Sequence, residues 1–412
     1  MDYSQALLVY VVMAPGAVFG GMALAWLAGW TPVERVISRI TGVVFASSVV
    51  ALAVMVWRRG AVTVTFGNWF TVGAYHFPLV LVADGLSLPF LGMTVLLAGL
   101  IGRFSSTYLH REPGFARFFL LLHLFAFGSL VAFAAGSFDL LAAGWELVGI
   151  TSVLLIGFFQ LRTSPVENAV RVFAVYRACD IGLLVAVFAM HNWGGLPALA
   201  GGRATTVGLL LLLAAAGKAA QVPFSGWLPR AMEGPTPSSA IFYGAISIHA
   251  GAYLLLRAQP VLAHSGLARA LVIATGVATA IHGTMAGRAS ADAKTSLAYA
   301  SLTQVGVVFV EIGLGWTTVA TVHILGHAMV RTLQFLRAPS MLHDYHKMHS
   351  AMGGEVAPTG KHLEAMFPER ARLWLYRWSL DRGNLDTILD RFAIGPLMGI
   401  SRGLGRVDGV GR

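Results

Sequence analysis

Residues 138–159 read FDLLAAGWELVGITSVLLIGFF and form the most informative apolar stretch of the chain. It is long enough to cross a bilayer, which takes roughly 20 residues of α-helix. Its ionisable side chains are Asp139, close to one end, and Glu146, about a third of the way in. A charge in hydrocarbon costs roughly 3 kcal/mol or more. Glu146 therefore either ties two helices together or belongs to an ion path, and this stretch alone leaves both interpretations open.

The rest of the chain is similarly apolar. Its 412 residues are 56% hydrophobic and 12% charged, whereas soluble domains carry about 25% charged residues. Long continuous apolar runs indicate membrane helices rather than the alternating segments of a β-barrel. The single cysteine, Cys179, excludes an internal disulfide and any site with four cysteine ligands. A first apolar run that is long enough to span predicts a retained helix and no cleaved signal peptide.

Apolar windows predict an all-α fold, a polytopic membrane helix bundle of about eleven spans with a cytoplasmic amphipathic tail. The predicted spans are residues 6–28, 37–57, 79–101, 115–135, 138–159, 169–190, 207–222, 238–256, 271–285, 295–314 and 317–335. The seventh is short, stops at Pro223 and is followed by a Gly- and Pro-rich stretch, which indicates either a broken helix of the kind that lines ion paths or an ordinary loop. Residues 61–77 alternate β-branched and polar side chains and predict a hairpin outside the membrane.

Loop charges predict the orientation. The loops after odd-numbered spans carry Arg35, Arg39, Arg103, Arg111, Arg162, Arg230, Arg288 and Lys294. The loops after even-numbered spans carry Arg58, Arg59, Arg203 and Arg257. The positive-inside rule then places the N-terminus outside and the tail in the cytoplasm. The net charge of +10 is mostly this topology signal, and no nucleic-acid motif accompanies it.

Beyond residue 340 the sequence turns polar, which divides the chain into a membrane bundle, residues 1–340, and a cytoplasmic tail for partner docking, residues 341–412. The tail histidines are His343, His346, His349 and His362. Their spacing matches no standard metal site, so a solvated face is expected and no metal. Residues 380–397 place apolar side chains near helical spacing and predict an amphipathic helix on lipid or on a partner. We expect Leu385, Ile388 and Phe392 to make the docking contacts.

Ionisable residues recur inside the predicted spans. They are Glu146 in the fifth, Arg177 and Asp180 in the sixth, Lys218 in the seventh, His249 in the eighth, Lys294 at the start of the tenth, and His323, His327 and Arg331 in the eleventh. Residues three or four apart on a helix share a face, so those of the sixth and eleventh spans form stacks. Any one of them could be a packing tie, but a series on consecutive helices predicts charge movement. Changing the separation of Glu146 and Lys218 would change which of them holds a proton, because burial penalises a charge and a nearby opposite charge stabilises it.

Several of these residues lie in motifs that resemble the antiporter-like family, which includes the L-type (chain 5) subunit of respiratory complex I and the large subunits of Mrp antiporters. The motifs are GWE at 144–146, GKAAQVP at 217–223, WLPRAMEGPTP at 227–237 and AYAS at 298–301. The resemblance covers roughly residues 79–337. It implies a bundle whose broken seventh helix carries a central lysine, Lys218, with Glu146 as switch glutamate and Lys294 as connecting lysine. It also implies that His323 and His327 are the family's paired histidines in the ion pathway.

The chain departs from this family in places. Tyr243 stands where complex I subunits usually have a histidine, Arg331 replaces a lysine, and the later spans with a second broken helix are not found. In this shortened form, and in FYGA at 242–245 and RTLQFLRAP at 331–339, the chain resembles the DabB family of membrane subunits from inorganic-carbon accumulation complexes.

That second resemblance implies a proton- or sodium-conducting subunit of the bacterial inner membrane. Its cation flow would drive hydration of CO2 to bicarbonate by a large cytoplasmic partner, a zinc-containing DabA-like protein that resembles a β-carbonic anhydrase. The alternative is the L-type proton-pumping subunit of a respiratory NADH-quinone oxidoreductase, or an Mrp-type cation/proton antiporter. The chain shows no dinucleotide fingerprint, nucleophile elbow or zinc-ligand spacing. We therefore expect no cofactor and no enzymatic activity in the chain itself, with any catalysis in a partner.

Overall fold

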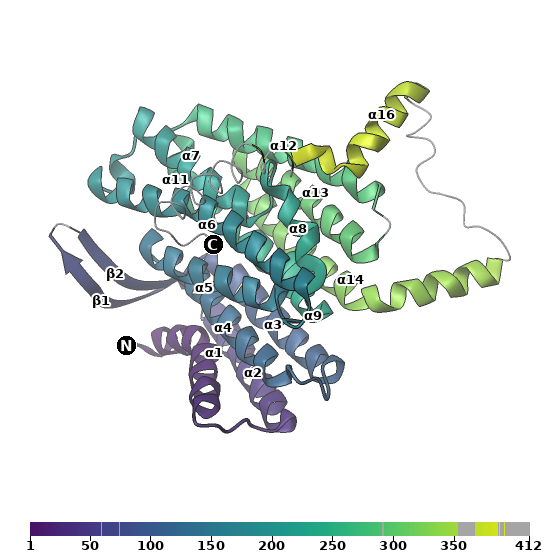
Figure 1. Ribbon diagram of the computed structural model, residues 1–412. Coiled ribbons are helices and arrows are strands. Elements are labelled where there is room, and N and C mark those ends of the chain that lie inside the picture. Colours follow the sequence, from purple (N-terminus) through teal and green to yellow (C-terminus); the bar gives the residue numbers. More distant parts are fainter. Residues whose placement is uncertain are drawn as a thin grey trace, which may run out of the picture.

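Helices build most of the protein, and a two-stranded hairpin lies at one end of the bundle (Figure 1). The computed structural model describes residues 1–58, 60–73, 75–290, 292–352, 367–385, 387 and 391. Its first part consists of α1 (Tyr3–Leu27), α2 (Glu34–Trp57), β1 (Val62–Val72), β2 (Tyr75–Ala83), α3 (Ser87–Tyr108), α4 (Phe115–Ala134) and α5 (Phe138–Ile156). The Ser137 side chain accepts a hydrogen bond from the Leu140 amide and so caps α5 one residue before the stretch 138–159 begins.

The second part is less regular. It consists of α6 (Thr163–Asn192), η1 (Leu196–Ala198), α7 (Gly201–Lys218), η2 (Phe224–Gly226), α8 (Trp227–Arg230), η3 (Ala231–Glu233), α9 (Thr236–Ser239), the π-helix η4 (Ala240–Ala245), α10 (Ser247–Arg257), α11 (Gln259–Ala263), α12 (Gly266–Arg288), α13 (Ala293–Leu314), α14 (Thr317–Met352), α16 (Glu369–Leu380) and η5 (Arg382–Asn384).

The described helices confirm a polytopic membrane bundle. Nine of them are long and apolar enough to cross a membrane, with α9, η4 and α10 acting together as one span, Thr236–Arg257. The other two predicted spans, residues 207–222 and 317–335, correspond to α7 and α14, which carry the cations Lys218 and Arg331.

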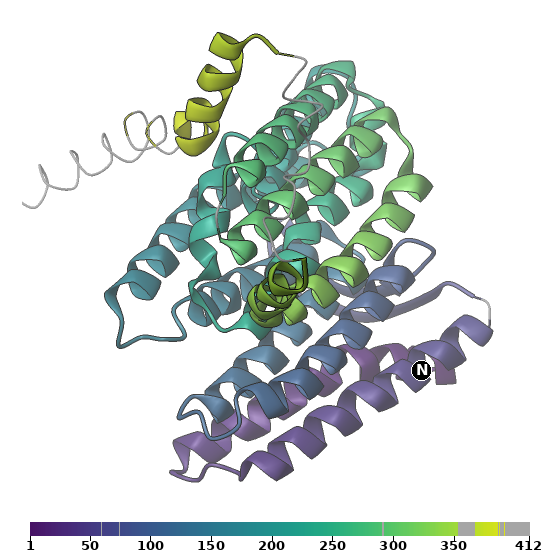
Figure 2. The same cartoon turned by 90° about the vertical axis from the view of Figure 1, so that its right-hand side faces the viewer.

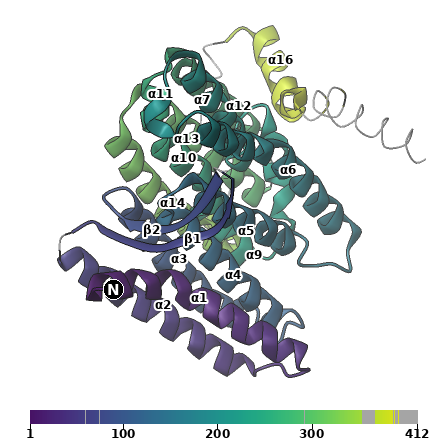
Figure 3. The same ribbon diagram turned by 90° about the vertical axis from the view of Figure 1, so that its left-hand side faces the viewer.

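The hairpin predicted from residue alternation is confirmed, and it is longer than expected. β1 and β2 pair antiparallel from Val62–Ala83 to Val72–Tyr75, so the third span starts at Ser87 and not at residue 79. Figure 3 shows both strands curving across the end of the bundle. The Gly136 amide donates to the Val80 carbonyl at 2.8 Å, which fastens β2 to the chain just before α5.

Glycines allow the helices around the site to approach closely. A Cβ at Gly144 of α5 would lie 2.6 Å from the Gly128 carbonyl oxygen of α4. A Cβ at Gly276 of α12 would lie 2.5 Å from the Gly306 carbonyl oxygen of α13. Small residues at such crossings hold membrane helices together where lipid gives no hydrophobic drive between them.

The predicted broken seventh helix is confirmed, although it ends at Lys218, before the proline that was expected to stop it. Ala220 adopts a left-handed φ of 52°, and short buried turns follow. The freed backbone groups find protein partners: Trp227 Nε1 donates to the Gly217 carbonyl at 3.0 Å, and the Val222 amide donates to Thr279 Oγ1 at 2.9 Å. Irregular backbone at membrane depth requires such internal partners.

The C-terminal elements extend from the bundle. α14 continues to Met352, beyond residue 340, and projects past the other helices, so that Figure 2 shows it end-on. α16 lies against α12, where the Trp378 and His282 ring centroids are 5.8 Å apart. Of the predicted docking residues, Leu385 is half-buried, whereas Ile388 and Phe392 lie outside the described residues.

Candidate functional site: two polar networks within the bundle

The first network joins α5 and α6 through an arginine. The Arg177 guanidinium forms an ion pair with Glu146 through Nη1, and its Nη2 lies 2.7 Å from Asp180 Oδ2. Both carboxylates therefore share one permanent cation, since arginine does not release its proton in proteins. Arg177, and not Lys218, is the direct partner of Glu146.

Lys218 lies at the end of α7 with 0% of its surface exposed. Its Nζ is 4.4 Å from the centroid of the Tyr176 ring and 4.7 Å from that of Trp145, and it donates to the Trp145 carbonyl at 3.3 Å. Cation–π contacts are worth about 2 kcal/mol when desolvated. The C-terminal end of α7 adds a partial negative charge beside the ammonium. Aromatic faces and a helix end thus hold a buried cation for which the described residues provide no direct ion pair.

Trp145 connects Lys218 to the carboxylates. Its Nε1 donates to Asp180 Oδ1 at 2.5 Å, while its ring and carbonyl contact Lys218. Gly149, one helical turn further on, leaves room for the ammonium, because a Cβ there would lie 3.0 Å from Lys218 Nζ. The network contains two carboxylates, Glu146 and Asp180, and two basic groups, Arg177 and Lys218. Its net charge is zero when all four are ionised, so the gain or loss of one cation leaves it with a net charge.

The second network joins α10 and α14 through histidines. His249 Nε2 lies 2.9 Å from His327 Nδ1, and Arg331 Nε donates to His327 Nε2 at 3.2 Å. His249 Nδ1 lies 2.5 Å from the Ala245 carbonyl oxygen at the end of the π-helix. His249 is 0% exposed and His327 is 8% exposed, so this chain of hydrogen bonds lies inside the bundle.

The two histidines that were expected to form a pair lie edge to face on α14, but they make no hydrogen bond to each other among those described. His323 Nδ1 lies 2.9 Å from Glu311 Oε1, and its Nε2 lies 3.1 Å from Gln304 Oε1, both on α13. The His323 and His327 ring centroids are 6.4 Å apart, and their nitrogens have different partners. His327 is connected to α10, and His323 to α13.

The broken segment between α7 and α10 lies between the networks. Trp227 packs against Tyr176 on one side and Tyr243 on the other, with ring centroids 5.1 and 5.9 Å away. The buried hydroxyls of Ser225 and Tyr243 find no hydrogen-bond partner among the described residues. Buried polar groups of this kind are usually satisfied by internal water, which makes this segment suitable for a hydrated connection.

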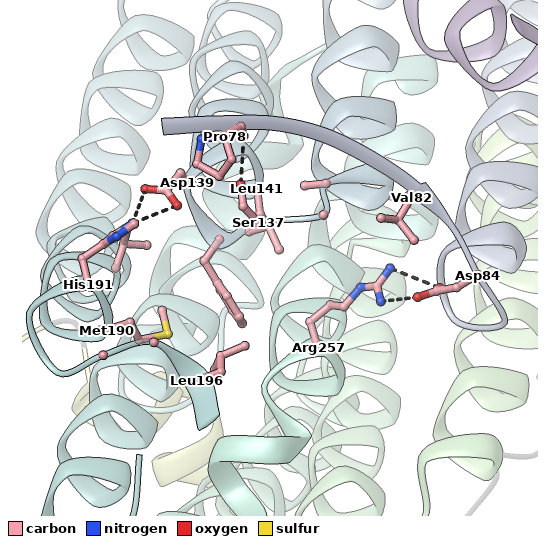
Figure 4. Close-up of a pocket in the computed structure, with 16 residues that line it drawn as sticks. Pro78, Val82, Asp84, Ser137, Asp139, Leu141, Met190, His191, Leu196 and Arg257 are labelled. Carbon is pink, nitrogen blue, oxygen red and sulfur yellow. Dashed lines mark hydrogen bonds and ion pairs between the residues drawn. The ribbon is translucent and has the colours of Figure 1, made fainter. Parts of the chain in front are cut away.

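A cavity of about 620 Å³ lies where β2 crosses the ends of α5 and α6 (Figure 4). Tyr75 Oη donates to Asp139 Oδ1 at 2.6 Å, and His191 Nε2 lies 3.0 Å from the same oxygen. Burial and the hydrogen bond to Asp139 raise the pKa of Tyr75 to about 12, so it remains a donor. Asp139 and Glu146 are seven residues apart on one face of α5, about 10 Å along the axis. The Asp139 side chain at the cavity therefore lies on the same face of α5 as Glu146.

On the opposite wall of the cavity, Arg257 and Asp84 form a two-point ion pair with distances of 2.6 and 3.2 Å (Figure 4). Burial alone would raise the pKa of Asp84, but hydrogen bonds from Arg257 and Ser87 outweigh it and lower the pKa to about 2. Asp84 also accepts the amides of Leu86 and Ser87 at the start of α3. This pair joins the hairpin end to α10 and is a structural tie.

Sequence reasoning located most of these residues and missed their connectors. Trp145 and Tyr176, which hold Lys218, and Gln304, which contacts His323, were not predicted. The adjacency of Trp145 to a buried glutamate is a signal that could have identified it. Lys294 lies half-buried in the first turn of α13, and within the described part of the chain no hydrogen bond or ion pair joins it to either network.

Comparison with known proteins identifies the family of the chain. Residues 135–354 match the family described as NADH:quinone oxidoreductase/Mrp antiporter, TM, and residues 69–119 match complex I chain 5 N-terminus. The chain is 33% identical to NADH-quinone oxidoreductase subunit L of Mycobacterium tuberculosis over 74% of its length and 50% of the relative's. It is 32% identical to NADH-ubiquinone oxidoreductase chain 5 of Neurospora crassa over 68% of its length and 41% of the relative's.

A solved structure of the Mrp complex from Dietzia sp. aligns with a TM-score of 0.69 at 27% identity, covering 80% of this chain and 37% of the matched one. The chain thus spans about half the length of the curated relatives it matches, or less. Fold and buried charges define a polytopic membrane protein of the antiporter-like type. Because the family match covers more than half of the sequence, the chain belongs to the NADH:quinone oxidoreductase/Mrp antiporter membrane family.

Proposed function

We propose that this protein is the cation-translocating membrane subunit of an energy-converting complex, and that it carries H⁺ or Na⁺ through the bundle. The observation that carries the proposal is the network of Glu146, Arg177 and Asp180 beside the fully buried Lys218. Such residues are costly inside a membrane and mark ion paths in membrane proteins. The Glu146 side chain is 33% exposed and Lys218 is fully buried, so the network joins a partly exposed carboxylate to a buried cation.

Flux measurements on the complex in lipid vesicles test the proposal. A pH gradient or a sodium gradient is imposed, and cation movement is followed with a dye or with ²²Na. Lys218→Ala should abolish flux while the complex still assembles, because no other described cation can take its place between Trp145 and Tyr176. Arg162→Ala is the matched control, since Arg162 is exposed and stacks on Phe159 outside both networks. Equal flux in the wild type and Lys218→Ala would refute the proposal.

Two kinds of complex are candidates for the partner. The matched relatives are subunits of NADH-quinone oxidoreductase, and the matched structure is an Mrp complex, which favours a proton-pumping or antiporter assembly. Residues 242–245 and 331–339 favour instead the DabB-type role in inorganic-carbon accumulation, with a large zinc-containing DabA-like subunit as partner. We propose that any catalysis resides in that partner and that the tail, including Leu385, contributes to docking.

Purification of the complex from native membranes separates the two candidates. A large soluble protein with bound zinc, identified by mass spectrometry, supports the carbon-accumulation role. Other complex I or Mrp subunits support the pump or antiporter role. The proposed location is the bacterial inner membrane with the N-terminus outside. Alkaline phosphatase fused in the loop at Gly194 should then be active, because that loop lies outside. The same reporter fused at Arg162 should be inactive, because that loop lies inside.

A further inference from the structure

The hydrogen bonds around the histidine pair fix where its protons lie. Arginine has donors and no acceptor, so Arg331 Nε donates and His327 Nε2 must accept. A neutral His327 therefore carries its proton on Nδ1. That proton points to His249 Nε2 at 2.9 Å, which must be the unprotonated nitrogen of His249.

The far end of the chain agrees with this assignment. His249 then carries its own proton on Nδ1, and the atom facing it at 2.5 Å is the Ala245 carbonyl oxygen, which can only accept. Along this chain from Arg331 to Ala245 every N–H donor thus faces one acceptor. All hydrogen bonds of the two histidines are therefore made with both rings neutral. Both histidines adopt the Nδ1–H form, although the two tautomers differ little in free energy until a partner selects one.

We infer that Arg331 is a gate, a positioning residue that locks the two histidines in a non-conducting state; the inference rests on the proposed translocation function. A proton entering His327 needs the Nε2 lone pair, and Arg331 occupies it. Arg331 cannot relay a proton, because its guanidinium stays charged. The other end of the pair is closed by a backbone carbonyl.

The Arg331 guanidinium has a second hydrogen-bond acceptor, which can keep it bound when it leaves His327. Arg331 Nη1 donates to Gln334 Oε1 at 2.7 Å, three residues along α14, on an exposed side chain. Rotation toward Gln334 would free His327 Nε2. A proton could then bind there while the Nδ1 proton of His327 passes to His249 Nε2, leaving His249 as the imidazolium and His327 neutral.

The experiment compares Arg331→Met with Arg331→Lys in the complex reconstituted in vesicles. Arg331→Met should raise passive proton leak about tenfold or more, the population shift expected from losing a charge-assisted hydrogen bond. Arg331→Lys should stay near wild type, because an ammonium can also donate to Nε2. His249→Gln in the Arg331→Met background should remove the extra leak. Arg337→Met, further along the same helix, is the control for loss of an arginine.

¹⁵N resonances of labelled histidines give a readout that a merely structural role would not move. The wild type should show His327 and His249, assigned by their Gln variants, as Nδ1–H tautomers. Arg331→Met should shift His327 toward the Nε2–H form, and Arg331→Lys should not. A wild-type His327 protonated on Nε2 overturns the inference, as does an Arg331→Met variant with unchanged leak. Absence of Lys218-dependent flux in the wild type refutes the proposed function instead, whatever the tautomers show.

Discussion

The two networks use arginine in opposite ways. Arg177 forms ion pairs with the carboxylates of Glu146 and Asp180, whereas the buried Lys218 contacts aromatic rings and the Trp145 carbonyl. Arg331 holds a neutral imidazole and fixes the direction of its hydrogen bonds. The first network therefore stores charge, whereas the second orders neutral groups that can take up a proton. The effect of a buried arginine thus depends on its neighbours: its guanidinium balances carboxylates in one network and occupies an imidazole lone pair in the other.

Their surroundings differ as well. The first network lies where α5, α6 and the end of α7 meet. The second lies between α10 and α14, next to the π-helix η4. π-Helical turns are rare and often occur at functional sites. Variants that act on one network and spare the other can test whether the two work in series.

The largest effect is expected from Glu146→Gln. The amide keeps the shape but removes the charge that pairs with Arg177, and it cannot take up or release a proton. We expect cation flux to fall to background, with assembly of the complex retained, measured by vesicle flux and by co-purification. Flux near the wild-type rate at normal expression would make Glu146 a packing tie and would leave the first network without a role in translocation.

The histidine chain should be next in sensitivity. His327→Ala removes both hydrogen bonds of the central ring, so we expect at least a tenfold loss of flux, the range for removing one proton-transfer group. His282→Ala is the comparison variant. That ring lies among Tyr299 and Trp378, with centroids 5.9 and 5.8 Å away, in a packing contact with α16. Equal tolerance of both changes would argue against proton transfer through α14.

A smaller effect is expected from Trp145→Phe. Phenylalanine keeps an aromatic face beside Lys218 but loses the hydrogen bond to Asp180, which is worth about 1.5–3 kcal/mol for a charged acceptor. We expect a several-fold loss of flux that Trp145→Ala deepens further. If Trp145→Phe and Trp145→Ala lose flux equally, the indole hydrogen bond matters and the cation–π contact does not.

The smallest effect on flux is expected from Asp84→Asn, which alters the structural tie outside both networks. Because the folded pKa of Asp84 is lowered to about 2, its stabilisation is fully present above the unfolded pKa and is lost as pH falls from about 4 to 2. The tie should be worth roughly 1–2 kcal/mol after solvent screening of this partly exposed pair. The thermal stability gap between wild type and Asp84→Asn should be constant from pH 8 to pH 5, narrow below about pH 4 and be largely gone near pH 2. A gap that does not narrow between pH 5 and pH 2 would contradict this account.

Sequence patterns predicted the class of fold and most residues of the candidate site. Apolar runs of membrane length identified nine spans now present as apolar helices, because hydrocarbon admits backbone only when its hydrogen bonds are satisfied within the segment. Residue alternation identified the hairpin, and Gly and Pro after Lys218 identified the break. Buried charges were visible because each is costly and rare at that depth.

The contacts between these residues depend on the tertiary structure, because they join side chains of different helices. Sequence spacing suggested that His323 and His327 act as a pair. Side chains one turn apart on α14 nevertheless project in slightly different directions, so His327 meets His249 of α10 and His323 meets Glu311 of α13. In the same way the packing of α5 on α6 places Arg177 between Glu146 and Asp180. Lys218 instead contacts the rings of Trp145 and Tyr176. Helical periodicity fixes neighbours within a helix, whereas partners across helices depend on how the helices cross. Small residues help to set such crossings, as Gly144 does between α5 and α4 and Gly276 does between α12 and α13.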